Sequence, residues 1–497
     1  MKKILILASF FSLLTGCKKD YLNNAAPTGD TDNLAIFTTT GNASNLMSGV
    51  YRYLYSRFDN QNTPGHGGVM LMLDFMGEDL HQAVATWYSP GNGTGGWVNH
   101  RNASYAYVQY PFRLYYRCIG NVNDLLDNID AATGTDGEKK RLKAEALTMR
   151  AWSYFNLVQM YAKRYVAGGV NSQLGLSMPL SAKDLKLPRS TVEQVYTQID
   201  KDLADAITFF ATASAPAAGP QTKSHLNLKS AWAIRARVAL TKQDYVNAAA
   251  YAQTVITLGG QSLMTNAQYQ AGFNDLSNPE WIWGCYVQDD QGDTFGSYFG
   301  QISWDGNTTY IRGTPKRINS ALYAGITATD VRKKMWEPTP TTVNFPLPAT
   351  NYSYSNYMSR KFKCRTLPTI GDVPYIRLAE MYMIIAEANA RSGNEPAARQ
   401  ALYTLAVNRD PNYVLSVNTG QALINEILNQ RRVEFWGEGF RFFDLKRLNL
   451  PMDRTVVPNY VSASGGGTLL VPAGGNIWEF VIPIAEINAN PNTVQNP

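Results

Sequence analysis

Apolar residues recur at intervals of three and four along most of the chain. In residues 138–165, for example, Leu142, Ala146 and Met149 fall on one side of a helix, and lysine, arginine and glutamate residues occupy the rest. This spacing is typical of amphipathic helices. The same pattern predicts helices over residues 42–57, 112–129, 138–165, 190–210, 427–448 and, as helix pairs, 228–258 and 375–407.

A capping signal marks where one of these helices begins. The run Ser190-Thr191-Val192-Glu193 places a hydroxyl side chain three residues before a glutamate. In a capping box these two side chains accept hydrogen bonds from each other's backbone N–H groups. We therefore expect Ser190 to cap a helix that ends near Phe210.

Two of the predicted helix pairs repeat one another. Residues 228–258 and 375–407 each carry a small residue late in the first helix and another 12 positions later, in the second. The small residues are Ala236 with Ala248 and Ala386 with Ala398, and the residues predicted to cap the second helices are Asp244 and Asn394. This is the tetratricopeptide pattern, in which small residues let helices pack closely and pairs stack into a superhelix. About four such units are expected, serving as a scaffold.

Residues 274–357 interrupt the helical pattern. They are rich in glycine, aspartate, tryptophan and tyrosine and show no helical period, so an irregular or weakly β segment is predicted. The chain's 29 tyrosines and 10 tryptophans suit flat, amphipathic recognition surfaces. A net charge of +6 over 497 residues, without a basic cluster interleaved with aromatic residues, argues against a nucleic-acid-binding protein.

The N-terminus carries the marks of a bacterial lipoprotein. Lys2 and Lys3 precede an apolar run that is too short to span a membrane but suits a signal peptide. The run ends in Leu14-Thr15-Gly16-Cys17, which matches the lipobox and predicts a signal peptide over residues 1–16 and a diacylated Cys17. Two or three acyl chains anchor a protein stably. Polar residues then predict a tether over 17–32, and Lys18-Lys19-Asp20 resembles an export signal to the cell surface.

The stretch ILNQRRVEFWGEGFRFFDLKRL, residues 427–448, is the most distinctive of the chain. Its charged residues alternate with apolar and aromatic ones, which predicts a helix kinked at Gly437 and Gly439. Arg441 lies three positions from both Glu438 and Asp444, so pairs along one helix face are expected. We interpret the charges as structural ion pairs that lock the helix to its neighbours.

This stretch resembles the signature RRxEFxxEGxRxxDLxR of the SusD/RagB-type outer-membrane nutrient-binding lipoproteins. The matching residues are Arg431, Arg432, Glu434, Glu438, Arg441 and Asp444. The tail FVIPIAEINANPNTVQNP, residues 480–497, also resembles the end of that family, as do the lipobox and the helices at 138–165 and 375–392. The resemblance thus extends over nearly the whole chain.

The resemblance implies a mainly α-helical, tetratricopeptide-like superhelix that carries a loop-rich, ligand-facing region. It divides the chain, after the leader and tether, into an N-terminal region over 33–225 and a C-terminal region over 226–497 that contains the 274–357 insertion. It also implies a surface-exposed lipoprotein of the outer membrane, without enzymatic activity. Such a protein closes as a hinged lid over a SusC-like TonB-dependent β-barrel transporter and delivers a nutrient to it.

No catalytic motif accompanies this signature. GxSxG, GxxxxGK[ST], HExxH and CxxC are all missing, and His66, His81 and His100 fit no metal-ligand spacing, so no metal is expected there. The acidic turn at Asp289, Asp290 and Asp293 leaves a structural calcium ion as the one cofactor to consider. Three cysteines besides Cys17 cannot all pair, which leaves a single Cys285–Cys364 bond open.

Aromatic residues in two irregular regions provide the candidate ligand site. Sugars present apolar CH faces ringed by hydroxyls, so a sugar site combines flat aromatic rings with Asn, Asp, Arg or Gln. The candidate ligand-binding residues are Trp87, Tyr88, Trp97, Asn99 and Arg101 in the first region and Tyr298, Trp304 and Tyr310 in the second. Trp97 and Trp304 are expected to be exposed, whereas Trp281, Trp283 and Tyr286 are assigned to the core.

A glycan is the ligand class that these loops favour. Three alternatives remain open at this stage: a lid that binds peptides or another nutrient, a glycosidase on a helical scaffold, and an assembly scaffold that binds no small ligand. Binding measurements separate the first from a glycan lid, and loss of turnover in a carboxylate variant would identify the second. Binding to the barrel alone would identify the third.

Overall fold

The computed structural model describes residues 33–84, 96–216, 219, 221–461 and 467–497. The predicted signal peptide, Cys17 and tether lie outside these ranges, as do Trp87 and Tyr88. No helix within the described ranges is long and apolar enough to cross a membrane.

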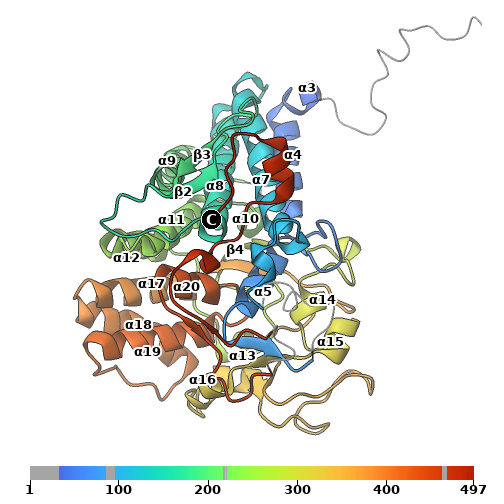
Figure 1. Cartoon of the computed structure of the whole chain (residues 1–497), viewed down its shortest axis with the longest axis vertical. Helices are drawn as coiled ribbons and strands as arrows, with labels where there is room; N and C mark the ends of the chain where they lie inside the picture. The colour runs from blue at the N-terminus through green and yellow to red at the C-terminus, as the bar shows by residue number, and fades with distance from the viewer. Residues whose placement is uncertain (1–32, 85–95, 217–218, 220, 462–466) are drawn as a thin grey trace, which may run out of the picture.

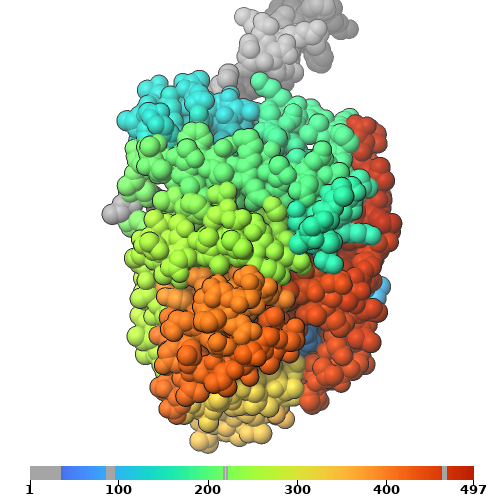
Figure 2. All heavy atoms as spheres, turned by 90° about the vertical axis from the view of Figure 1, so that its left-hand side faces the viewer, coloured from blue at the N-terminus to red at the C-terminus, as the bar shows by residue number. Residues whose placement is uncertain are grey.

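Antiparallel helix pairs stack along one side of the molecule. Figure 2 shows them in chain order, from green through lime to orange, down a single face. Their elements are α7 (Ala106–Asn128), α8 (Asp136–Tyr161), α9 (Val192–Phe210), α11 (Leu228–Thr241), α12 (Tyr245–Thr257), α17 (Leu378–Arg391), α18 (Glu395–Arg409) and α19 (Gly420–Glu434). Each pair contacts the next, through α9 with α11 and α12 with α17. This is the helical superhelix that the sequence predicted.

Small residues and caps explain this packing. The four alanines of the repeat, Ala236, Ala248, Ala386 and Ala398, are fully buried where the helices meet. Asp244 caps α12 by accepting a hydrogen bond from the Asn247 N–H. Asn394 occupies the same position before α18 without a side-chain cap.

The cap of α9 lies one residue later than predicted. Thr191, rather than Ser190, accepts the N–H of Gln194, and the Gln194 side chain accepts the Thr191 N–H in return. Ser190 belongs instead to the short strand β3 (Arg189–Thr191). The capping box therefore uses Thr191 and Gln194, since the strand extends up to the cap.

Short elements cover the other side of the molecule (Figure 1). The helices are α3 (Asn33–Ile36), α4 (Thr40–Tyr53), α5 (Gly65–Phe75), α10 (Gln221–Ser224), α13 (Asn266–Tyr269), α14 (Phe299–Ile302), α15 (Thr309–Gly313), α16 (Ser320–Ala324), α20 (Arg441–Arg447) and α21 (Ile484–Ala489). The 3-10 turns are η1 (Asn99–Arg101), η2 (Ile129–Ala131), η3 (Asp289–Gln291), η4 (Val331–Met335) and η6 (Asn476–Trp478). Residues 274–357 therefore have the irregular structure predicted for them.

The β-structure is small and antiparallel. One four-stranded sheet has the order β1 (Leu80–Gln82), β5 (Lys316–Ile318), β7 (Met358–Ser359), β6 (Trp336–Glu337). The two-stranded pairs are β2 (Leu174–Ser177) with β3, β4 (Trp281–Cys285) with β8 (Val373–Arg377), and β9 (Met452–Asp453) with β10 (Leu470–Val471). The β4–β8 pair ties the start of the 274–357 insertion to the segment that enters α17.

The 427–448 stretch forms the end of one helix and a second helix, rather than one kinked helix. Gly437 and Gly439 have φ angles of +82° and +83°, which a side chain disfavours, and they separate α19 from α20. An added Cβ on Gly439 would lie 2.7 Å from the Met70 Cα in α5. The glycines thus let the chain turn in close contact with α5.

The C-terminal tail crosses the helical layer. In Figure 1 it runs back, in red, along α7 and α8. The Phe480 N–H donates to the Met160 carbonyl, and the Asn496 side chain donates to the carbonyls of Tyr161 and Phe480. The tail therefore fastens the C-terminal region to the first helices of the fold.

Candidate functional site

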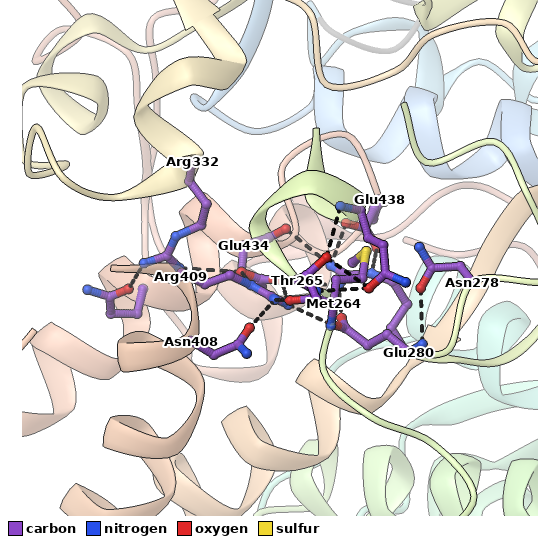
Figure 3. Close-up of polar contacts among 12 residues, drawn as sticks. Met264, Thr265, Asn278, Glu280, Arg332, Asn408, Arg409, Glu434 and Glu438 are labelled. Atoms are coloured by element: carbon purple, nitrogen blue, oxygen red, sulfur yellow. Dashed lines mark hydrogen bonds and ion pairs between the residues drawn. The ribbon is translucent and has the colours of Figure 1, made fainter. Parts of the chain in front are cut away.

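Glu434 lies at the centre of a buried ionic cluster. Figure 3 shows Arg332, from η4, and Arg409, from the end of α18, directed toward it. The Glu434 carboxylate lies 3.0 Å from Arg409 Nη2, 3.1 Å from Arg377 Nη1 and 3.4 Å from Arg332 Nη1. Burial alone would raise the pKa of this carboxyl, but Arg409, Arg377 and Arg332 hold the pKa well below its usual range.

Two further glutamates, an aspartate and a lysine complete the cluster. Glu438 accepts hydrogen bonds from Lys361 Nζ at 2.7 Å and from two nitrogens of Arg377 at 2.8 Å. Glu280 accepts from Arg409 at 2.7 Å and also pairs with Arg377. Asp330, which pairs with Arg332 at 2.6 Å, is the fourth carboxylate against four cations. All these side chains are buried and mutually neutralised, so the cluster has the character of a structural joint between separate segments.

The rest of the signature also pairs across segments. Arg432 donates to Asp79, and Arg441 donates to Glu78; both carboxylates lie just before β1. Asp444 accepts from Arg431 at 2.7 Å and from Arg447 at 2.9 Å. The predicted partners of Arg441 within its own stretch are therefore wrong. Glu438 lies before the turn at Gly439 and pairs with Arg377, whereas Asp444 shares α20 with Arg441 but pairs with Arg431 and Arg447.

Three residues predicted to contact ligand are buried. The solvent-exposed fraction is only 2% for Trp97, 3% for Tyr298 and 1% for Tyr310. The Trp97 indole donates to the Met76 carbonyl at 2.9 Å and packs on Trp478, and the Tyr298 hydroxyl donates to the Gly437 carbonyl at 2.6 Å. The expected exposure of Trp97 is wrong, since its ring fills the core beneath the C-terminal tail.

Asn99 and Arg101 are partly exposed but face the tail. Arg101 Nη1 donates to the carbonyls of Asn476 and Glu479, at 3.0 and 2.8 Å. Asn99 makes a side-chain hydrogen bond to Tyr105. The guanidinium of Arg101 therefore serves the attachment of the tail, whereas the Asn99 side chain bonds a residue of its own segment.

Among the tryptophans predicted to bind ligand, Trp304 is the one in the described ranges that is partly exposed. Its ring is half-buried and meets Phe345 edge-on, with the ring centroids 5.4 Å apart. Exposed Asn307 and Thr309 follow it in the chain. A partly exposed indole bordered by an amide and a hydroxyl offers the combination that a sugar ring needs.

The sequence prediction missed a second aromatic platform, Tyr286. Trp281 and Trp283 are fully buried in β4, as predicted, but Tyr286 comes directly after the strand and is 36% exposed. The signal for this exposure is the polar run Gln288-Asp289-Asp290 that follows it. A tyrosine at the boundary between a buried strand and a polar turn presents its ring at the surface.

Two adjoining hollows share Tyr286 and Gln288. The larger has a volume of about 920 Å³ and the smaller about 340 Å³. Charged and amide side chains line both hollows, namely Lys223, Asp275, Asp289, Asp290 and Arg365 around the larger and Arg52 and Gln291 around the smaller. An exposed ring between polar rims of this size suits an extended, hydroxyl-rich ligand.

Residues 362–365 connect the two aromatic platforms. The Phe362 carbonyl accepts the backbone N–H of Trp304 at 3.1 Å. Three residues on, the Arg365 guanidinium lies 5.9 Å from the centre of the Tyr286 ring and pairs with Asp372 at 2.7 Å. Three residues of extended chain span about 10 Å. The segment 362–365, which contacts Trp304 at one end and Tyr286 at the other, is therefore a short connection between the two aromatic residues.

The residues considered for metal binding have protein partners. Asp293 accepts two hydrogen bonds from Arg57 at 2.6 Å, and Asp289 faces Arg365 at 3.4 Å. The three histidines contact Tyr115, Asn459 and Ile477 separately. Across the described ranges, no group of three or more His, Cys, Asp or Glu side chains is placed to hold a metal ion. Cys285 and Cys364 are free buried thiols, so the bond left open between them is not formed.

Comparison with known structures identifies the same fold. A SusD-like carbohydrate binding protein from Bacteroides vulgatus is 25% identical, with 92% of this chain and 98% of that chain covered at a TM-score of 0.77. A SusD superfamily protein from Bacteroides thetaiotaomicron is 23% identical, with 92% and 100% covered at a TM-score of 0.75. Surface glycan-binding protein A of the same species, in complex with laminarihexaose, is 17% identical, with 92% and 100% covered at a TM-score of 0.70.

Family models match most of the sequence. A model described as starch-binding, associating with outer membrane, matches residues 67–240. No curated protein matches the chain. The model of the SusD family matches residues 237–497, more than half of the chain, and includes the 427–448 signature and the tail. The chain therefore belongs to the SusD family.

Proposed function

We propose that this protein binds an oligosaccharide at the cell surface and passes it to a TonB-dependent β-barrel transporter, over which it closes as a lid. The observation that carries the carbohydrate part is the exposed Tyr286 ring, which stands between two polar-rimmed hollows and close to the segment 362–365 that contacts Trp304. Two aromatic rings that contact the same segment, 362–365, suit a ligand of several sugar units, in which each ring stacks on the apolar face of one sugar.

The relatives support the ligand class. One structure with this fold and 25% identity is a SusD-like carbohydrate binding protein, and another protein of the fold was captured with laminarihexaose. Both relatives favour a glycan rather than a peptide as the ligand of this chain. We infer binding rather than catalysis, because the hollows offer hydrogen-bonding and stacking groups and one matching family model is described as starch-binding.

Each group in the hollows has a role in binding. Asp289 and Asp290 accept hydrogen bonds from sugar hydroxyls, and Gln288 accepts and donates. Arg365, held by Asp372, donates to hydroxyl or ring oxygens beside the Tyr286 ring. This mixture of fixed polar groups would select the arrangement of hydroxyls, whereas the aromatic rings would supply affinity.

Electrophoresis of the purified protein through gels containing single polysaccharides tests the ligand class. Retardation by one polysaccharide, and its loss in Tyr286→Ala, is the expected result. Trp232→Ala is the matched control, because Trp232 is a half-buried aromatic residue on α11 that lines neither hollow at Tyr286. Binding of peptide digests without retardation by any polysaccharide would favour a peptide lid instead.

The anchor and the partner need separate tests. We propose that Cys17 is acylated and holds the protein in the outer membrane, facing the exterior. Cys17→Ala should release the protein from the membrane fraction. The lid function predicts that the acylated protein co-purifies with a large outer-membrane β-barrel, and purification without such a partner would contradict it.

A further inference from the structure

A further hollow is formed by residues that are distant in sequence from those around Tyr286. It has a volume of about 340 Å³ and lies between the loop that follows α8, the end of α20 and the tail around η6. None of its lining residues lines the hollows at Tyr286. On the face in Figure 2, the blue-green loop after α8 borders the red C-terminal part of the chain. The site therefore does not depend on the proposed glycan platform.

Glu479 lines this hollow, and one oxygen of its carboxylate lacks a hydrogen-bond partner in the described structure. The residue is 2% exposed, and its Oε1 has no hydrogen-bond donor among the residues that the structure describes. Its backbone carbonyl, by contrast, accepts from Arg101 at 2.8 Å. A buried carboxylate oxygen without a donor is costly, so a native structure is expected to supply one from another source.

The neighbouring lysine cannot be that donor. Lys446 Nζ donates to the carbonyls of Gln159, Ala162 and Trp478, each at 2.7 Å. Because an ammonium group has three N–H donors, all of them are used, two at the C-terminal end of α8 and one at η6. Lys446 therefore has no free hydrogen bond to offer Glu479.

Two further cations stand at the rim. Lys163 is exposed and Arg164 is partly exposed, and both line the hollow. Within the described structure neither has a carboxylate within 4 Å. Burial raises the pKa of the Glu479 carboxyl, although Lys446 and Lys163 act to lower it. Burial lowers the pKa of Lys446 to about 7, so the charge of the hollow is set by Lys163 and Arg164 at its rim. Two rim cations against one carboxylate attract an anion.

Apolar groups form the remaining wall. Leu450 and Val166 line the hollow and are 36% and 40% exposed, and Trp478 lies beside them. The site thus combines an acceptor at its base, cations at its rim and an apolar side. A molecule that matches it carries hydroxyl donors, an acidic group and a CH face together.

We propose that this hollow binds a sugar acid, a monosaccharide-sized molecule with several hydroxyls and one carboxylate. Its hydroxyls donate to Glu479, its carboxylate pairs with Lys163 and Arg164, and its ring lies against Leu450. The volume holds one or two sugar rings. The ligand is recognised by the same groups whether it is free or the end of an acidic polysaccharide.

Calorimetric titration of the purified protein with glucuronate, a short polyuronide and glucose tests this assignment. We expect glucuronate to bind, and glucose to bind about tenfold more weakly because it lacks the carboxylate. Glu479→Gln and the double variant Lys163→Ala, Arg164→Ala should each weaken glucuronate about tenfold. Lys201→Ala, an exposed lysine on α9, and Tyr286→Ala should leave glucuronate affinity unchanged.

Several results would overturn the proposal. They are the absence of glucuronate binding, equal binding of glucose, or unchanged binding in both Glu479→Gln and the rim variant. The rim variant guards against loss of fold, since Lys163 and Arg164 make no buried ion pair. Binding of the polyuronide without binding of glucuronate would also overturn the proposal, because the hollow is assigned to a single sugar acid. Loss of glucuronate binding in Tyr286→Ala would move the ligand to the other hollows and contradict the assignment.

Discussion

Arg377 and Glu438 form a two-pronged ion pair in the interior, with Nε and Nη2 of the arginine each 2.8 Å from a carboxylate oxygen. Arg377 ends β8 and caps α17, and Glu438 lies between α19 and α20. The pair thus joins the tetratricopeptide-like helices to the glycine turn of the signature. Both side chains are buried, so each requires the other's charge.

Removal of one partner should therefore be costly. Glu438→Gln leaves Arg377 and Lys361 with less compensating charge, and we expect the free energy of unfolding to fall by about 3–5 kcal/mol. Urea unfolding of wild type and variant measures this free-energy difference. Asp205→Asn is the control, because the exposed Lys201–Asp205 pair should contribute less than about 1 kcal/mol. Equal losses in the two variants would contradict a structural role for the cluster.

The stability supplied by Asp444 should depend on pH. Burial would raise the pKa of this carboxyl, but Arg431 and Arg447 lower it from the ordinary 3.8 to about 2. Because the folded pKa lies below the unfolded one, the stabilisation is complete above about pH 4 and is lost as the pH falls toward 2. The stability gap between wild type and Asp444→Asn should thus narrow by about 2 kcal/mol between pH 5 and pH 2. A gap that stays constant in urea unfolding would refute this.

Gly439 should tolerate no side chain. Its φ of +83° strains an alanine, and the added Cβ would also meet the Met70 backbone at 2.7 Å. Gly393 provides the matched control, with a φ of +85° and open space around it. Gly393→Ala should cost about 1 kcal/mol, and Gly439→Ala a further 1–3 kcal/mol, roughly, from overpacking. Thermal unfolding of both variants separates strain from contact, and equal melting temperatures would argue against the close approach.

Two of the tryptophans first assigned to the ligand, Trp97 and Trp304, should behave differently. Trp97→Ala removes a buried ring and its hydrogen bond to Met76, so stability should fall by about 3–5 kcal/mol while the folded protein binds ligand as before. Trp304→Ala should cost less stability, since the ring is partly exposed, but should weaken binding. Melting curves and polysaccharide affinity, measured on the same preparations, check both. Loss of affinity in folded Trp97→Ala would contradict its structural role.

Local patterns in the sequence predicted the helical scaffold well. The spacing of Ala236 and Ala248 depends on contacts between adjacent helices, and the cap at Asp244 depends on three residues. Such signals lie within a few turns of chain, where periodicity and capping rules apply. At the start of α9 the predicted cap is displaced by one residue, because the strand reaches Thr191.

The aromatic residues were harder to place, because their surroundings come from distant segments. Tyr298 looks exposed among glycine and serine, yet its hydroxyl bonds Gly437, 139 residues away. In the sequence Tyr286 looks like part of an apolar strand, yet it lies just after the strand's last residue, Cys285. The partners of Glu434 likewise lie in η4, at the end of β8 and in α18. Spacing in the sequence cannot identify contacts that the tertiary fold creates.

The central claim is that Tyr286 and Trp304 bind one glycan, and calorimetric titration tests it most directly. The ligand is an oligosaccharide of the polysaccharide that retards the wild-type protein. We predict that Tyr286→Ala and Trp304→Ala each weaken its affinity about tenfold, as loss of a stacking ring should, while Trp232→Ala leaves it unchanged. Wild-type affinity in both Tyr286→Ala and Trp304→Ala would show that the glycan binds elsewhere and would contradict the account.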